Sequence, residues 1–243
     1  MQLYTFLEIE RIQQDIPYLI EIMEWVKNFL AKPHPDLGRN GPVCPFVPQS
    51  IKLNSIQMAV IRAKNLEPQK IEDIVKNYRD TFLQMEPRDR KAGINKAFLL
   101  IFPDLDPDQA STLIDGVQKK LKPFFVEEGL MIGEFHKRTE TRGLHNQNFY
   151  PLRSPIPLLA IRFMVEGDLP FLTNADNPNL RIKYIEAYLR HFEKESKDET
   201  KLKTAYQELA LAKEKVFQEN VNNFTYKMIW KMKFSNPFAH HHN

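Results

Sequence analysis

Two side chains able to exchange protons, Glu134 and His136, lie two residues apart in the segment LMIGEFH. Successive side chains of a β-strand point to opposite faces, so a strand over 130–136 would place Ile132, Glu134 and His136 on one face. A carboxylate and an imidazole on a shared face are groups that general acid–base catalysis uses. The sequence therefore predicts Glu134 and His136 as catalytic residues.

An arginine, Arg162, interrupts the apolar segment 158–165. Burying this charge without a partner would cost several kcal/mol, so a carboxylate or a bound anion is expected beside it. If the segments 130–136 and 158–165 pair as strands, Arg162 could lie near Glu134. The alternative is a purely structural ion pair between these two residues.

The segment 33–48 contains five prolines and two glycines, which predict an ordered or functional loop without regular structure. Within it, His34 and Cys44 are candidate metal or haem-iron ligands, because imidazole and thiolate both donate to iron. Arg39 could bind a carboxylate. The alternative is that Cys44 is a small buried hydrophobic residue and the prolines only route the chain.

A second loop, 137–155, carries four Lys or Arg residues against one Glu, together with asparagines. Cationic and amide side chains suit carboxylates, including haem propionates, so Arg142 and Arg153 join Arg162 as candidate binding residues. A solvated basic loop is the alternative. RNA binding is disfavoured, since neither further positive charge nor a stacking motif accompanies the loop.

Hydrophobic spacing and capping signals predict the elements that would position these residues. Apolar residues at spacings of three and four over 4–30 predict a long N-terminal helix, which Pro17 would either kink or divide. The remaining pattern predicts strands over 55–62, 97–102, 130–136 and 158–165, and helices over 68–83, 107–121 and 197–217 and from 177.

The segment 224–234 alternates apolar residues with lysines, a period of two that predicts an amphipathic strand. Its apolar row would need cover from its own sheet or from a second subunit, so a homodimer is expected as well. The tail 236–243 contains three consecutive histidines and resembles a purification-tag remnant, and it is excluded from the site.

The strands at 130–136 and 158–165 are joined without a helix, which favours an α+β fold over a doubly wound one. We expect a mixed, largely antiparallel sheet flanked by helices. The prediction is one domain over 1–235, made of an N-terminal helix over 1–32, a proline-rich loop over 33–50, the sheet, and a C-terminal helix and strand over 197–235.

Composition excludes several classes of protein. The 34 basic and 31 acidic residues give a net charge of +3, which is too small to indicate nucleic-acid binding. One cysteine allows no internal disulfide, and no membrane span or signal-peptide pattern is visible, so a cytoplasmic location is expected. The phosphate-binding, nucleophile-elbow and zinc motifs are lacking, which argues against kinases, nucleotide-dependent dehydrogenases and lipases.

The segments HPDLGR, GPVCPF, MIGEFH and PLRSP, in this order within 5–195, resemble an uncharacterised bacterial family. More distantly, the Cys-Pro-Phe segment and the strand that ends in histidine are similar to YqcI/YcgG-type proteins, some of which are haem-dependent N-oxygenases. The resemblance implies a haem with His136 or Cys44 as its proximal ligand. The other residues it would place at the cofactor are His34, Arg39, Arg142, Arg153 and Arg162.

Three functions follow as hypotheses. The leading one is a haem-dependent oxidising enzyme of the oxygenase type, acting on a small carboxylated or amine-containing metabolite. The second is a non-catalytic binding module for an anionic small molecule or a protein partner. The third is a metal-free acid–base enzyme that uses Glu134 and His136. If one composite site exists, Cys44 and the two strands should face a single cavity.

Overall fold

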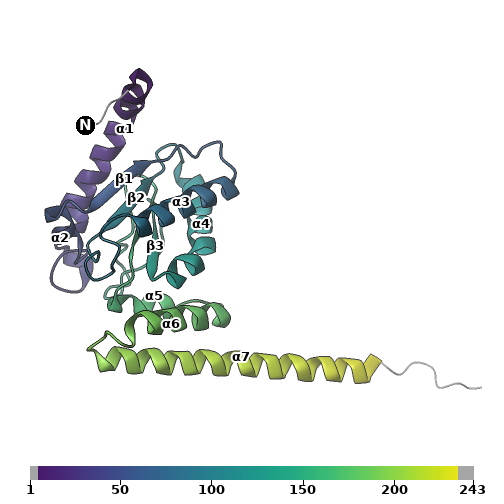
Figure 1. Ribbon diagram of the computed structural model, residues 1–243. Coiled ribbons are helices and arrows are strands. Elements are labelled where there is room, and N and C mark those ends of the chain that lie inside the picture. Colours follow the sequence, from purple (N-terminus) through teal and green to yellow (C-terminus); the bar gives the residue numbers. More distant parts are fainter. Residues whose placement is uncertain (1–4, 235–243) are drawn as a thin grey trace, which may run out of the picture. The chain divides into compact units, whose positions relative to one another are not determined.

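The computed structural model describes residues 5–234, and the contacts among them group into two compact units (Figure 1). The first unit ends at Val165 and the second begins at Glu166. The single domain expected over 1–235 stays a prediction. No helix in residues 5–234 is both long enough and apolar enough to cross a membrane.

The first unit is built around a four-stranded sheet. Its strands are β1 (Ile56–Val60), β2 (Ala97–Ile101), β3 (Leu130–Phe135) and β4 (Leu158–Phe163), in the order β1-β2-β4-β3. The pair β1–β2 is parallel, whereas β2–β4 and β3–β4 are antiparallel. This confirms the α+β class and the mixed, largely antiparallel sheet, and it leaves β3 at one edge.

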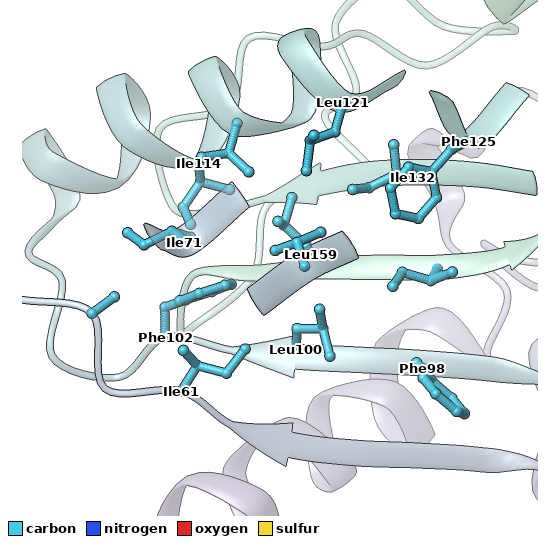
Figure 2. Packing of buried hydrophobic residues seen from close by; sticks show 14 of the residues in the cluster. Ile61, Ile71, Phe98, Leu100, Phe102, Ile114, Leu121, Phe125, Ile132 and Leu159 are labelled. Carbon is cyan, nitrogen blue, oxygen red and sulfur yellow. The ribbon is translucent and has the colours of Figure 1, made fainter. Parts of the chain in front are cut away.

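Helices α3 (Pro68–Gln84) and α4 (Pro107–Glu127) cover one face of this sheet (Figure 2). The core between them and the strands includes Ile71, Ile114, Leu121, Ile132 and Leu159. Helix α4 begins where its capping signal predicts, because the carboxylate of Asp106 accepts hydrogen bonds from the backbone N–H groups of Asp108 and Gln109. It continues past the expected end, with Pro123 inside it.

Helix α1 (Phe6–Trp25) packs on the opposite face, so the predicted N-terminal helix is confirmed as one helix with Pro17 inside it. It ends in a π-helical turn, Val26–Leu30. The core on this face joins residues of α1 and the turn to sheet residues; its buried members include Ile22, Val26, Leu30, Leu99, Ile101 and Leu158.

The proline-rich segment is more regular than predicted. A 3₁₀-helix forms over Pro35–Leu37, and α2 (Val47–Lys52) begins inside the segment expected to be loop. Proline is tolerated in the first turn of a helix, where its missing N–H would have no partner, and Pro48 occupies that turn of α2. An isolated antiparallel bridge between Pro33 and Pro42 closes the rest into a compact loop.

The second unit is helical. A 3₁₀-turn over Glu166–Asp168 precedes α5 (Leu169–Thr173), α6 (Pro178–Phe192) and α7 (Glu199–Phe234). Asn177 caps α6 as predicted, because its side-chain oxygen accepts from two backbone N–H groups. The hydroxyl of Tyr188 donates to the backbone carbonyl of Glu166 across 3.1 Å, and burial raises the pKa of Tyr188 to about 12.

The C-terminal strand predicted over 224–234 is wrong, because α7 runs without interruption from Glu199 to Phe234. Neither glycine nor proline occurs in this stretch, and an established helix extends at little cost for each residue added. A strand would instead need a neighbouring edge for its hydrogen bonds. The tail 236–243 lies outside the described residues.

Candidate functional site

A pocket of about 490 Å³ opens beside the end of β3, where the chain leaves the edge of the sheet. Helix α4 contributes one wall, β3 another, and the turn after β3 the third. Seven residues line the pocket: Ser111, Asp115, Glu134, Arg138, Thr139, Glu140 and Thr141. Glu134, predicted as catalytic, is therefore in the pocket wall, together with part of the predicted basic loop.

Glu134 reaches this pocket because of the strand's alternation. It shares the α4 face of the sheet with Ile132, as predicted, and its antiparallel partner on β4 is Leu159. The Thr141 hydroxyl donates to Oε1 of Glu134 at 3.2 Å. Burial raises the pKa of the Glu134 carboxyl, and the nearby charge of Asp115 raises it further.

His136 is almost completely buried, with 1% of its surface exposed, and both of its ring nitrogens are hydrogen-bonded. Nδ1 accepts from the backbone N–H of Arg138 at 3.2 Å. The proton therefore lies on Nε2, which donates to Oδ1 of Asp115 at 2.8 Å. This pair fixes the carboxylate of Asp115 at the pocket wall, while about half of the Asp115 side chain remains exposed.

The turn after β3 is held in place by further contacts. The guanidinium of Arg138 forms an ion pair with Asp108 on α4, and the backbone N–H of Thr139 donates to the carbonyl of His136 at 3.2 Å. Nε of Arg153 donates to the carbonyl of Thr139 at 3.4 Å. Arg153 also stacks 4.1 Å above the Tyr150 ring, so it supports the loop behind the pocket.

Arg162 does not lie beside Glu134. The β3–β4 register places Arg162 opposite Met131, three residues from the partner of Glu134. An odd offset along a strand changes the face, so Arg162 belongs to the α1 face and Glu134 to the α4 face. The Arg162 guanidinium donates to the backbone carbonyl of Phe163 at 2.9 Å. The predicted Arg162–Glu134 pair is therefore wrong.

The proline-rich loop lies on the α1 side of the sheet, away from the pocket. Cys44 is partly buried against the core of that face, as its alternative interpretation predicts. Arg39 donates to the carbonyls of Asn40 and Val43 within its own loop. The sheet thus separates Cys44 from Glu134, and the prediction that they share one cavity is wrong.

The two predicted loops nevertheless meet on the α1 side. The rings of His34 and Phe149 lie 4.7 Å apart, and the side-chain amide of Asn146 donates to the carbonyl of Asp36 at 2.8 Å. Gly38, with a φ of 75°, approaches the backbone of His145 so closely that a Cβ atom would lie 2.7 Å from its carbonyl oxygen. These contacts give His34 a packing role.

The candidate haem residues do not fit one haem site. Cys44 and His34 lie on the α1 side, whereas His136 lies on the α4 side with both nitrogens engaged. Arg142 is exposed on the loop surface. Within residues 5–234, no three His, Cys, Asp or Glu side chains converge in a way that could hold a metal ion.

Asp115 is a pocket residue that the sequence interpretation missed. A signal for it exists: Asp108, Ser111 and Asp115 follow one another at spacings of three and four, which places them on one face of α4. Such a polar row on a core-packed helix marks the edge of the buried stripe. Thr141 was also missed, and nothing in its surroundings in the sequence singles it out.

Neither the curated proteins nor the solved structures contain a match to this sequence. A family model described as a domain of unknown function (DUF6875) matches residues 19–203, which is more than half of the chain. The match includes every residue that lines the pocket and both loops that meet on the α1 side. The distant similarity to YqcI/YcgG-type proteins stays a prediction. The chain belongs to the DUF6875 family, a family of unknown function, as the resemblance to an uncharacterised family implied.

Proposed function

We propose that the pocket beside β3 is an acid–base site in which Glu134 exchanges a proton with a small amine-containing metabolite. The observation that supports this proposal is the position of Glu134: its carboxyl lines a pocket of about 490 Å³ and has a pKa raised by burial. A carboxylate with a raised pKa is a stronger base than an ordinary glutamate, and its acid form persists to higher pH.

The proposal assigns one set of roles to residues that line the pocket and another to the buried His136. Glu134 would contact the substrate and transfer the proton, and Thr141 would orient its carboxylate through the hydrogen bond to Oε1. Asp115 would face the bound molecule, held by Nε2 of His136. His136 would be a positioning residue, because its buried ring uses both nitrogens within the protein.

The charges around the pocket favour an amine over a carboxylate. Three carboxyl groups line it, those of Asp115, Glu134 and Glu140, whereas Arg138 is engaged by Asp108. These three carboxyl groups would repel a ligand carboxylate. The ligand would also have to compete with Asp108 for Arg138. An ammonium group would instead gain favourable charge interactions, which are stronger in a partly buried site than in water.

Haem-dependent oxidation stays a prediction from the resemblance. No geometric observation supports it, because the candidate ligands are divided between the two sides of the sheet. Its test is the absorption spectrum of protein expressed with added haem. A Soret band that survives gel filtration, and that is lost in Cys44→Ala or His136→Ala, would favour haem over the acid–base proposal.

The acid–base proposal is tested with matched small molecules. Saturation-transfer NMR would compare ethanolamine, putrescine and lysine with succinate, using the wild-type protein, Glu134→Gln and the exposed control Glu128→Gln. We expect the amines to bind wild type and the control. Succinate should bind weakly or not at all. Stronger binding of succinate than of the amines would contradict the proposal.

Catalysis is distinguished from simple binding by following bound amines with mass spectrometry. Conversion that disappears in Glu134→Gln while binding persists would assign the proton transfer to Glu134. Binding without conversion of any bound amine would favour the non-catalytic binding module.

A further inference from the structure

Helix α1 exposes a row of large apolar side chains. Ile12, Ile16 and Ile20 are spaced by four residues, and Ile9 and Phe6 continue the row toward the N-terminus at spacings of three. Their exposed fractions run from 42% for Ile12 to 90% for Phe6. This row, called the α1 stripe below, consists of Phe6, Ile9, Ile12, Ile16 and Ile20.

The α1 stripe is not the face with which the helix packs on the sheet. The core on that side contains Ile22 and Val26, which are 0% and 4% exposed. Each residue turns an α-helix by 100°, so Ile22 points about 160° away from Ile20. Helix α1 therefore has two apolar faces, one buried against the sheet and one uncovered among the described residues. Figure 1 shows the N-terminal part of α1 extending beyond the strands.

The polar residues of α1 are predominantly acidic. Between Phe6 and Trp25 the helix has five acidic residues and one basic residue, although the whole chain has a net charge of +3. The acidic residues are Glu8, Glu10, Asp15, Glu21 and Glu24, and the basic one is Arg11. Helical rotation places Glu10 and Glu21 together along one border of the α1 stripe, called the acidic border below. Glu8 and Asp15 lie on the other side of the helix, where Glu8 accepts hydrogen bonds from Thr5 at the N-cap and Asp15 forms an ion pair with Arg62.

We propose that the α1 stripe binds a basic amphipathic helix of a partner protein. Apolar residues at spacings of three and four match the side-chain rows of a second helix. Lysine or arginine residues on one flank of that partner would face the acidic border, which supplies both attraction and register. The partner is thus defined as a helix with one apolar row and a positively charged flank.

The same charges disfavour two other occupants. An amphipathic helix that lies on a membrane surface carries Lys and Arg on its polar face, whereas the acidic border is repelled by anionic headgroups. A second copy of α1 would bring the acidic border against the same border of its partner in an antiparallel pair, which is destabilising. A basic helix is the occupant that complements both the apolar row and the acidic border.

Binding of designed peptides to the full chain tests this proposal. One fluorescent 21-residue helical peptide has leucines in an apolar row with lysine flanks, and a second has the same leucines with glutamate flanks. We expect the lysine peptide to bind, the glutamate peptide to bind about tenfold more weakly or worse, and added salt to weaken the lysine peptide's binding.

Two variants locate the effect on α1. Ile12→Gln/Ile16→Gln should weaken lysine-peptide binding about tenfold or more. The control Phe124→Gln/Leu144→Gln removes two comparably exposed apolar side chains elsewhere in the same unit and should leave binding unchanged. Glu10→Lys/Glu21→Lys reverses the charge of the acidic border and should shift the preference toward the glutamate peptide. Circular dichroism verifies that each variant keeps its helix content.

Several results would overturn the proposal. Equal binding of the two peptides, or equal loss of binding in the α1 variant and its control, would show that no charge-selective site exists on the α1 stripe. Sedimentation of the full chain as a dimer that Ile12→Gln/Ile16→Gln dissociates would identify a second copy as the occupant. Co-sedimentation with phosphatidylcholine–phosphatidylserine vesicles, lost in the same variant, would identify a membrane surface.

Discussion

Nε2 of His136 lies 2.8 Å from Oδ1 of Asp115, so a fully buried imidazole ends on a carboxylate that remains about half exposed. The two ends of this hydrogen bond therefore have different roles. The histidine is part of the packed interior, and the aspartate forms part of the pocket wall.

His136→Ala should lower the free energy of unfolding by about 2 to 3 kcal/mol, because it removes a buried ring and leaves a backbone N–H without its acceptor. Asp115→Asn should cost only about 1 kcal/mol, since water reaches Asp115 and the amide oxygen can still accept from Nε2. Urea unfolding measures both values. A larger loss in Asp115→Asn than in His136→Ala would contradict this division.

Glu134 should make the protein less stable as the pH rises. Burial raises its folded pKa above the ordinary value of 4.5, so the folded chain holds a proton that the unfolded chain has released. The contribution of Glu134 is therefore fully present below pH 4.5 and is lost as the pH rises through the folded pKa. The stability of wild type minus that of Glu134→Gln should decline across this range, whereas the control Glu128→Gln should show no such decline.

Lys96→Met should destabilise the first unit by about 3 kcal/mol or more, because a buried ammonium that satisfies three carbonyl groups is lost. Nζ of Lys96 donates to the backbone carbonyls of Phe82, Met85 and Pro87 at 2.7 to 2.8 Å, and only 3% of the residue is exposed. The exposed control Lys70→Met should change stability by less than about 0.5 kcal/mol. Equal effects in the two variants would show that the three carbonyls gain nothing from Lys96.

Two glycine-to-alanine substitutions should have opposite effects. Gly38→Ala introduces a Cβ atom 2.7 Å from the carbonyl oxygen of His145 at a positive φ, and it should cost about 1 to 3 kcal/mol. Gly116→Ala places a methyl group in open space on helix α4, and it should add about 0.5 to 1 kcal/mol. Thermal unfolding compares the two, and a stabilised Gly38→Ala would contradict the close contact between the two loops.

Local signals in the sequence were sufficient to predict most of the helices and strands. The caps Asp106 and Asn177 each precede a proline, and both helices begin there. The alternation of side chains along β3 predicted the face of Glu134, and the strand register confirms it. This prediction depends only on the strand itself. Such signals act within a few residues and need no knowledge of the remaining fold.

The position of Arg162 could not be obtained in this way. Its face relative to Glu134 depends on how two strands, separated by a long loop, align with each other. A shift of one residue in that alignment exchanges the faces, and the segment composition does not fix it. The alternation of apolar residues and lysines over 224–234 led to the wrong prediction of a strand for a related reason. A strand forms only where the edge of a neighbouring strand is available for its hydrogen bonds.

The strand order β1-β2-β4-β3 has a consequence for the ribosome-bound chain. The central strand β2 is complete once Ile101 has been made, but its second neighbour, β4, begins only at Leu158. Until then one edge of β2 offers unpaired N–H and C=O groups to other chains. Closing this pair late, across a large separation in sequence, is intrinsically slow. Protein yield should therefore depend on how well the nascent chain is protected while α4 and β3 are synthesised.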